Sequence, residues 1–428
     1  MTIRRALTPA VLIAAISAIG PSPAAAQPCE PARPGVPRTL FERVPIVNSV
    51  QMAATRDGGA VIAFSVYDGS REFPDANFTV LALDSSGCVR WRASLRGQFL
   101  ARPIQPDARS IVVASGTISG EPLRIYTLSA RTGRVLRTGV FRSLNAIGTT
   151  LLADRRGNLA VTLASAGEGP QTLKLTRRAG STRWARQVIN DSNIQAPAAM
   201  ARPSGEMVVG YPRRGRFLVR TGTIAGVLGR PMDVGPVTGN FKPSAVALGR
   251  DGSIAAVWQS VTYNAPWRLR AAVRPAGASR FARFAQLGFG GAGSFLGATP
   301  PAVRVGAGGR VVIGFATGEA FMCANATRAS RFGRPNRIAA GGVADSDLPA
   351  MLFGPAGSGT IVASASGGTG LVRVGAGCDP RGQERLDAEA GVPQQAAIDA
   401  RGRTWVLGQP RRVADVGVPE DLRLTIVS

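Results

Sequence analysis

Two groups of carboxylates lie close enough along the chain to be considered for acid–base chemistry. Asp68, Glu72 and Asp75 share one segment that contains glycine and proline, and Asp345 and Asp347 share another. A pair of carboxylates can hydrolyse a glycosidic bond, one acting as the acid and the other as the base or nucleophile. Acidic residues among glycines and prolines more often serve turns and solvation. The pattern therefore favours turns, with a glycoside hydrolase as the alternative.

The chain of 428 residues contains no histidine and no Cys-x-x-Cys spacing. Histidine is the commonest general base, completes serine triads and is the usual ligand of catalytic zinc. We therefore expect no catalytic, cofactor-binding or metal-binding residues, and no cofactor. The sequence favours a protein that is not an enzyme.

A repeated pattern determines the expected fold. Eight times, a polar turn is followed by a short apolar run, as in residues 56–59 followed by residues 60–64, and successive copies lie 43 to 57 residues apart. This period suits four strands and their turns, and Val- and Ile-rich runs bounded by Gly, Pro and Asp are strand signals. No segment has a sustained helical period. The sequence predicts an all-β fold, a single β-propeller of about eight four-stranded blades, with about seven as the alternative count.

The second half of each copy predicts two further strands, which include residues 182–184 and a strand at Phe281. Residues 128–136 resemble the blade motif Ala-x-Asp-x-x-Thr-Gly-x-x-x-Trp of quinoprotein-like propellers with PQQ-type repeats. Residues 175–184 fit its spacing, and residues 82–91 fit it with one residue deleted. The resemblance covers three blades. It implies a turn at the glycine and a Trp that packs between blades, so it indicates the fold and not an activity.

The same resemblance raises a quinone-dependent dehydrogenase as a second enzymatic alternative. Members with that activity hold calcium with carboxylate and amide ligands, use an aspartate base, and often carry a disulfide between adjacent cysteines. This chain has no adjacent cysteines, and no carboxylate matches the motif. The resemblance therefore indicates a non-enzymatic exported member of the family.

Conspicuous aspartates and tryptophans are assigned to the framework. The aspartates are predicted to stabilise turns and the tryptophans to pack between blades. Residues 402–405 match the second half of the repeat motif of sialidase-type propellers, but Ala400 stands where its aspartate belongs. The residues assigned in this way are Asp84, Asp251, Asp399, Trp91, Trp184, Trp258 and Trp405.

The N-terminus has the order of a secretory signal. Arg4 and Arg5 precede an apolar run over residues 6–19, and small residues end at Ala26. The run is shorter than the roughly 20 residues that span a bilayer, and no later segment is long and apolar enough, so no transmembrane segment is expected. Gln27 and Pro28 depart from a lipoprotein signal. We predict a signal peptide over residues 1–26, cleavage near Ala26, and a soluble, extracytoplasmic propeller over residues 27–428.

Strand-like residues 39–46 precede the first blade, and the last copy supplies only three strands, at residues 394–399, 404–407 and 423–427. We predict that both ends of the chain form one closing blade, because closure removes open sheet edges.

The four cysteines are expected to form disulfides, as an even number in an exported chain favours. Cys88 and Cys378 follow glycines in matching turns of different blades. Cys323 lies in the blade before Cys378, and Cys29 leads into the first blade. We therefore pair Cys29 with Cys88 and Cys323 with Cys378.

The net charge of +25 comes almost entirely from arginine, since the only lysines are Lys174 and Lys242. One interpretation is a compositional bias spread over a solvated surface. The other is attraction to an anionic polymer. Arginines cluster at residues 213–216, at residues 328–337 and at residues 411–412. We take Arg213, Arg214 and Arg216 as anion-binding candidates, since guanidinium groups bind phosphate and carboxylate in two-point contacts.

The function expected from these observations is that of a non-catalytic binding or scaffold protein outside the cytoplasm. Its partner is expected to be an anionic polymer of the cell envelope or an envelope protein. Nucleic acid is not expected, because no single basic run resembles a nucleic-acid-binding arm. The alternative is an exported enzyme of propeller type.

Overall fold

The structure is a computed structural model of the chain. It describes residues 29–44, 47–66, 77–98, 101–116, 122–166, 169–191, 195–261, 267–289, 301–316, 320–326, 331–340, 350–353, 359–365, 368–375, 377–386, 392–409 and 420–427. The chain divides into two compact units, Met1–Glu30 and Pro31–Ser428. The predicted signal peptide lies outside the described residues.

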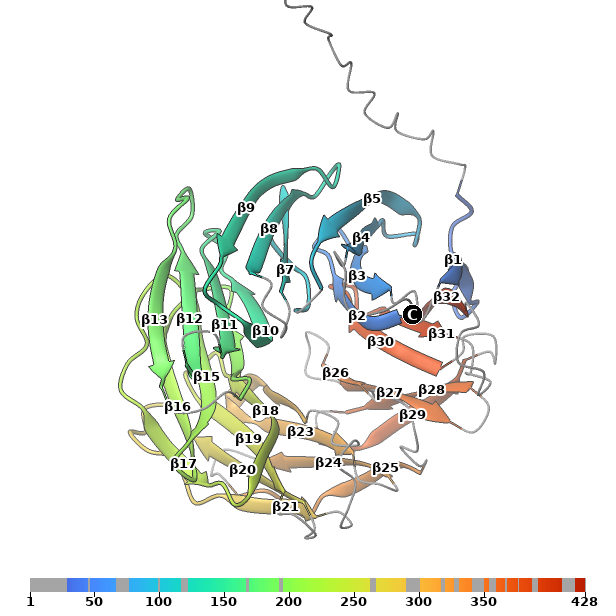
Figure 1. Ribbon diagram of the computed structural model, residues 1–428. Helices are drawn as coiled ribbons and strands as arrows, with labels where there is room; N and C mark the ends of the chain where they lie inside the picture. Colours follow the sequence, from blue (N-terminus) through green and yellow to red (C-terminus); the bar gives the residue numbers. More distant parts are fainter. Residues whose placement is uncertain are drawn as a thin grey trace, which may run out of the picture. The chain divides into compact units, whose positions relative to one another are not determined.

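The second unit consists of eight four-stranded antiparallel sheets, which Figure 1 shows arranged around a common centre. Blade 1 contains β2 (Val47–Ala54), β3 (Ala60–Val66), β4 (Asn77–Leu83) and β5 (Val89–Arg96). Blade 2 contains β6 (Ile104–Asp107), β7 (Ser110–Ser115), β8 (Leu123–Ser129) and β9 (Val135–Phe141). Blade 3 contains β10 (Ala146–Ala153), β11 (Leu159–Ser165), β12 (Gln171–Arg177) and β13 (Ala185–Asn190). Blade 4 contains β14 (Ala198–Ala201), β15 (Glu206–Arg213), β16 (Arg216–Thr223) and β17 (Met232–Pro236).

The other four blades follow the same order. Blade 5 contains β18 (Asn240–Leu248), β19 (Ile254–Val261), β20 (Arg268–Arg274) and β21 (Ala285–Phe289). Blade 6 contains β22 (Ala302–Val305), β23 (Val311–Ala316), β24 (Ala320–Ala326) and β25 (Asn336–Ala340). Blade 7 contains β26 (Ala350–Phe353), β27 (Gly359–Ala365), β28 (Gly368–Val374) and β29 (Pro380–Arg385). Blade 8 contains β30 (Val392–Ile398), β31 (Thr404–Gln409), β32 (Glu420–Val427) and β1 (Arg38–Val44).

The all-β propeller of eight blades predicted from the sequence is confirmed. Each of the eight apolar runs forms the second strand of a blade. Six of the turns before these strands hold glycine at positive φ, as at Gly58 (84°), Gly157 (82°) and Gly252 (87°), a conformation that strains any residue with a Cβ. The described residues contain no α-helix, only a 3-10 turn at Ala307–Gly309. In the part of the chain that is described, no helix has the length and apolar character needed to cross a membrane.

Burial follows from the position of a strand within its blade. All seven residues of β11 are buried, because blades 2 and 4 pack against the two faces of blade 3. The outer strand β9 instead alternates between exposed and half-buried residues. The core is therefore a series of apolar layers between neighbouring blades.

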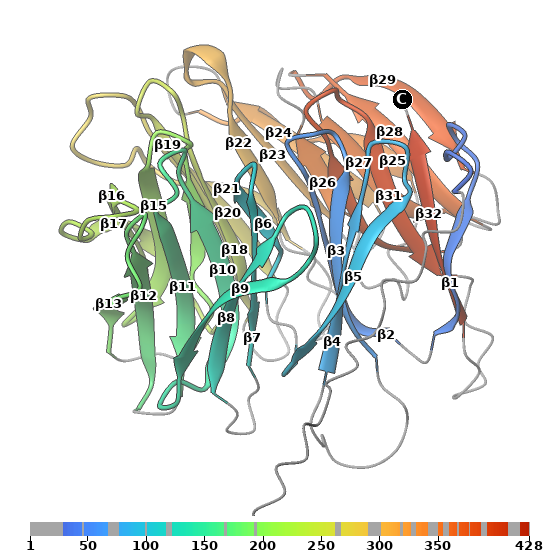
Figure 2. The ribbon, with the colours of Figure 1, turned by 90° about the horizontal axis from the view of Figure 1, so that it is seen from above.

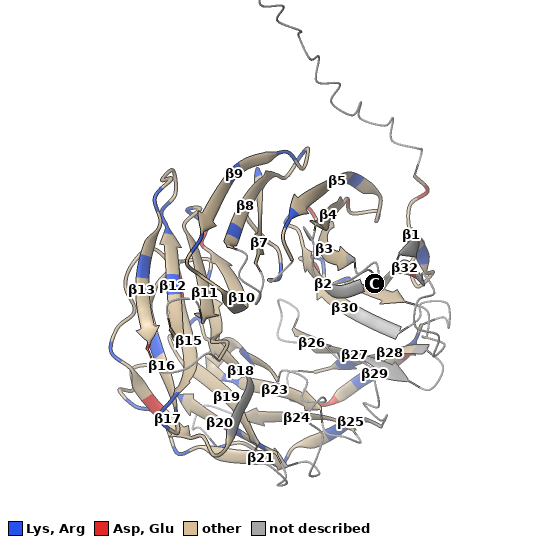
Figure 3. Ribbon diagram, in the orientation of Figure 1, with Lys and Arg blue, Asp and Glu red and all other residues tan. Residues whose placement is uncertain are grey.

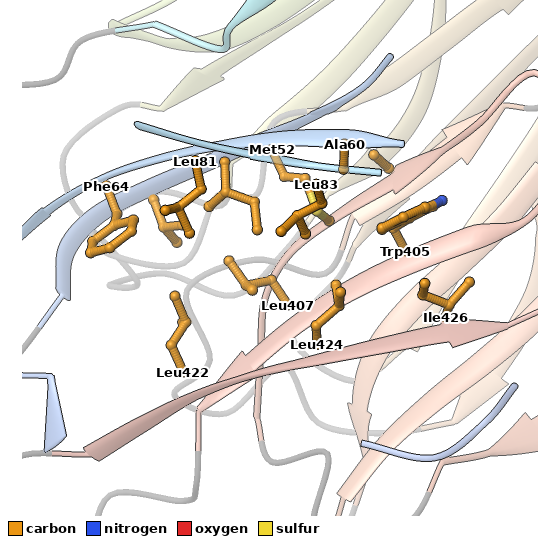
Figure 4. Packing of buried hydrophobic residues seen from close by; sticks show 13 residues of the cluster. Met52, Ala60, Phe64, Leu81, Leu83, Trp405, Leu407, Leu422, Leu424 and Ile426 are labelled. Atoms are coloured by element: carbon orange, nitrogen blue, oxygen red, sulfur yellow. The ribbon is translucent and has the colours of Figure 1, made fainter. Parts of the chain in front are cut away.

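The predicted closure of the ring is confirmed. β1 pairs antiparallel with β32, with Arg38 opposite Leu424 and Phe41 opposite Leu422. Blades 8 and 1 also share one apolar cluster, in which Leu81 and Trp405 are fully buried. Figure 4 shows the side chains of the two blades facing one another in this cluster.

Two predicted strands lie in turns instead. Residues 182–184 precede β13, and Phe281 precedes β21. The ring of Trp184 packs edge-on against Phe141 of blade 2, with centroids 5.6 Å apart. Phe281 packs against the apolar cluster of blades 4 and 5. These apolar residues therefore pack between blades. In the sequence they resemble strand residues, which is why the sequence pattern predicts strands at these positions.

Candidate ligand-binding surface

Aspartates in the turns stabilise the backbone, as predicted. In the turn between β4 and β5, Oδ1 of Asp84 accepts hydrogen bonds from the backbone N–H groups of Ser86 (2.8 Å) and Cys88 (3.0 Å). Asp154, between β10 and β11, accepts equivalent bonds from residues two and four positions further on. Asp251 accepts the N–H and the hydroxyl of Ser253. These carboxylates are occupied by their own turns.

Asp399 lies one position before Ala400, which occupies the aspartate position of the sialidase-type motif, and it stabilises the turn from there. Its Oδ1 accepts the backbone N–H groups of Arg401 (2.9 Å) and Arg403 (3.0 Å). Its Oδ2 accepts the indole N–H of Trp405 (3.2 Å) and Nε of Arg403 (2.8 Å). Burial alone would raise the pKa of Asp399, but the hydrogen bonds from Trp405 and Arg403 outweigh it and lower that pKa. Asp399, one position before Ala400, therefore stabilises this turn.

The tryptophans pack between blades, as predicted. The indole N–H of Trp91 in blade 1 donates to the carbonyl of Ala130 in blade 2 (2.8 Å). Trp258 is fully buried and stacks on Phe217, with ring centroids 5.4 Å apart. Trp405 is fully buried in the closing cluster. The rings of these three side chains are covered by the framework.

The candidate acidic pairs are not brought together by any described contact. Asp68, Glu72, Asp75, Asp345 and Asp347 all lie outside the described residues. Among the residues that are described, no three His, Cys, Asp or Glu side chains gather as a metal site would require.

The four cysteines are disulfide-bonded. Cys323 pairs with Cys378, as predicted, with Cα atoms 5.5 Å apart and a sequence separation of 55. This bond links β24 of blade 6 to the turn between β28 and β29 of blade 7. Cys29 and Cys88 are also disulfide-bonded, in agreement with two predicted pairs.

The anion-binding candidates occupy the hairpin between β15 and β16. Arg214 and Gly215 form its tip, both at positive φ (47° and 74°). Arg216 makes a two-point contact with the carboxylate of Asp233, and Arg213 lies 3.4 Å from Asp191. The structure therefore engages two of the three candidate arginines with aspartates and leaves Arg214 exposed at the tip.

A second basic surface follows from the strand order. Because the four strands of a blade are antiparallel and sequential, the turn after the first strand and the turn after the third strand lie at the same end of the sheet. Figure 2 shows the strands running between the two ends of the ring. We call the end formed by these two sets of turns the basic end, and the other end the opposite end.

Contacts between neighbouring blades place these turns at a common end. Arg403 in blade 8 donates to the carbonyls of Gly58 (2.7 Å) and Ser85 (2.8 Å), which lie in the two turns of blade 1. The backbone N–H of Arg155 in blade 3 donates to the carbonyl of Pro203 in blade 4 (2.9 Å). The turns of successive blades therefore form one continuous surface.

Charge is distributed unequally between the connections. By sequence, the turns of the basic end contain 19 arginines and 6 aspartates, a net charge of +13. By sequence, the connections after the second and the fourth strand of each blade contain 6 arginines and 12 acidic residues, of which Arg102, Arg142, Asp191 and Arg214 belong to the described residues. Figure 3 shows basic residues recurring around the ring.

Most of the arginines at the basic end are exposed. Sixteen of those described are exposed and have no carboxylate within salt-bridge distance among the described residues. They are Arg56, Arg109, Arg131, Arg134, Arg155, Arg156, Arg178, Arg183, Arg230, Arg250, Arg280, Arg283, Arg310, Arg331, Arg334 and Arg401. Most of this surface does not show as a cluster in the sequence, because its arginines are spread over seven of the eight blades; only Arg331 and Arg334 belong to a cluster noted from the sequence.

A buried lysine was also missed. Lys174 in β12 is fully buried, and its Nζ donates to the carbonyls of Thr223 (2.7 Å) and Gly226 (2.5 Å) of blade 4. Burial lowers the pKa of Lys174 to about 8. The signal in the sequence is a lysine between two leucines of a buried strand, in a chain with only one other lysine.

Comparison with known proteins agrees with this architecture. The sequence model of the PQQ-repeat family described as outer membrane protein assembly factor BamB matches residues 46–227, which run from blade 1 into blade 4. No curated protein matches the chain.

Solved structures show the fold alone. The Chaetomium thermophilum Sqt1 structure, bound to the N-terminus of ribosomal protein L10, is 12% identical, with a TM-score of 0.55 over 89% of this chain and 96% of that one. The β-propeller domain of the Trilobed protease from Pyrococcus furiosus is 10% identical, with a TM-score of 0.44 over 80% of this chain and 98% of that one. Together with the eight four-stranded blades, the match over residues 46–227 supports a β-propeller with PQQ-type repeats.

Proposed function

We propose that this protein is a non-catalytic binding or scaffold propeller that acts outside the cytoplasm on an anionic partner of the cell envelope. The observation that carries the proposal is the set of exposed arginines without a carboxylate partner among the described residues. An arginine whose only role is to keep the surface hydrated gains nothing from being far from carboxylates. An arginine that binds an anionic ligand must be without a carboxylate partner, because the ligand takes that place beside the guanidinium group.

The extracytoplasmic location is part of the proposal. It is supported by the signal-like N-terminus over residues 1–26 and by the disulfide-bonded cysteines, since disulfides persist in oxidising compartments.

Two surfaces are candidates for the anion-binding site. The hairpin at Arg213, Arg214 and Arg216 contributes one arginine that is not engaged with an aspartate. The basic end contributes sixteen exposed arginines. Exposed ion pairs are worth only about 0–1 kcal/mol each, so the surface with many sites is favoured.

The test is binding of the mature chain, residues 27–428, to purified cell envelope and to an immobilised anionic polysaccharide. Neutral dextran serves as the control. At physiological salt the Debye length is about 8 Å, which screens diffuse attraction but not direct contacts. We expect binding to envelope and anionic polymer to persist partly at this salt, with none to dextran. Complete loss of binding at physiological salt would overturn the proposal.

A further inference from the structure

The basic end carries a further inference, which rests on the proposed function and specifies the ligand and its orientation. We propose that the basic end binds a linear polyanion that runs across several blades, while the opposite end points away from it. The ligand chemistry is a chain of closely spaced phosphate or carboxylate groups.

The first step is the form of the surface. The exposed arginines of the basic end come from different blades, as Arg131 in blade 2, Arg156 in blade 3 and Arg280 in blade 5 do. No two of these are held together by a shared carboxylate among the described residues. A compact anion would therefore meet one or two guanidinium groups, whereas an extended chain can meet guanidinium groups on several blades.

The second step is energetic. A single exposed contact is weak, but linked contacts bind with a high effective concentration, so a polymer that engages several of them binds far more tightly than its repeating unit. The surface is thus expected to prefer long polyanions over short ones, in addition to preferring anions over neutral chains.

The third step is orientation. Within the described residues, the connections of the basic end contain 18 arginines and 6 aspartates, whereas those of the opposite end contain 3 arginines and 1 aspartate. A charge difference of this kind orients a protein on a polyanion, because the more positive end is attracted more strongly. The orientation therefore does not require a deep pocket.

The experiment compares two variants that each lose three exposed arginines. The first removes basic-end residues, R131S/R156S/R178S. The matched control removes R142S/R268S/R385S. Arg142 lies in a connection at the opposite end, Arg268 begins β20 there and Arg385 ends β29 there. Both variants have the same net charge, so a difference between them reports position rather than charge. The control leaves the hairpin at Arg213, Arg214 and Arg216 intact.

The probes are long-chain polyphosphate, polygalacturonate and tripolyphosphate, measured by calorimetry at physiological salt. We expect the long chains to bind at least about a hundredfold more tightly per molecule than tripolyphosphate. We expect the basic-end variant to bind long chains about tenfold more weakly than the parent, and the control to bind within about twofold. Comparing polyphosphate with polygalacturonate shows which anionic group is preferred.

The outcomes separate this inference from the proposed function. If the parent binds long polyanions but both variants weaken equally, the assignment to the basic end is wrong while the proposed function stands. If tripolyphosphate binds as tightly as the long chains, a compact anion site replaces the linear ligand. If the parent binds neither polymer nor envelope, both proposals fail. Circular dichroism of each variant confirms that the propeller is folded.

Discussion

Replacing Lys174 with methionine should change stability in a way that depends on pH. The side chain is fully buried in β12, and burial lowers its pKa from 10.5 to about 8. Between these values the unfolded chain holds a proton on Lys174 that the folded chain has released. The unfolded state therefore binds more protons, and the free energy of unfolding of the parent rises with pH across this window. Each pKa unit corresponds to about 1.36 kcal/mol, which gives a total gain of about 3 kcal/mol.

The assay is urea unfolding of the parent and the Lys174→Met variant at about pH 7 and about pH 10.5. Methionine keeps an unbranched side chain and removes the titrating group, so the titrations of all other residues cancel in the comparison. We expect the substitution to cost about 3 kcal/mol more at the higher pH. Because no described cysteine is free, no thiolate is present to start disulfide exchange in alkali.

The matched control is Leu175→Ala in the same strand. Leu175 is buried, so its truncation should cost about 2–5 kcal/mol at both pH values. Equal slopes of the unfolding free energy against urea in all three proteins are needed for the comparison. If Lys174→Met costs the same at both pH values, the carbonyls of Thr223 and Gly226 offset the burial of the ammonium. The pKa of Lys174 would then not be lowered in the folded state.

Three further predictions concern the framework. Removing the Cys323–Cys378 disulfide by the double change to serine should cost about 4 kcal/mol, because the bond closes a loop of 55 residues; an unchanged denaturation midpoint would contradict this. Asp399→Asn should cost about 1–3 kcal/mol near neutral pH and remove part of the acid sensitivity. The lowered pKa of Asp399 means that its stabilisation is present above the unfolded value and is lost as pH falls through the folded value, so parallel acid-unfolding curves for parent and variant would refute it. Leu424→Ala should cost about 2–5 kcal/mol through the closing cluster, measured by thermal unfolding; a loss of under about 1 kcal/mol would show that closure contributes little.

The sequence predicts most of the fold because its determinants are local. A glycine at positive φ, as at Gly58, has a recognisable turn sequence, and the apolar run that follows belongs to a strand buried on both faces. The closing blade could be predicted from the missing fourth strand of the last repeat. The start of β13 could not be predicted in the same way. Trp184 precedes this strand and packs on Phe141 of blade 2, a tertiary contact that the local sequence does not reveal.

The candidate site is predicted less well because its determinants are not local. Arg213 and Arg216 lie three positions apart in sequence and resemble an anion site, but their partners Asp191 and Asp233 come from other strands or strand ends. Lys174 is engaged by carbonyls of the next blade, about one repeat further on. Asp191, Thr223 and Gly226 are fixed as partners by the packing of blade 3 against blade 4, and Asp233 by the pairing of β16 with β17 within blade 4.

The distribution of arginine argues against composition as its full explanation. A uniform bias toward arginine would fill all connections in proportion to their length. Among the described residues, the turns of the basic end contain 18 arginines in 75 residues, whereas the other connections contain 3 in 26. Both sets join the same strands and need the same solvation, so solvation does not distinguish them. What differs is the end of the ring at which each set leaves its strands, and a property that follows the end of the ring is one that a ligand can recognise.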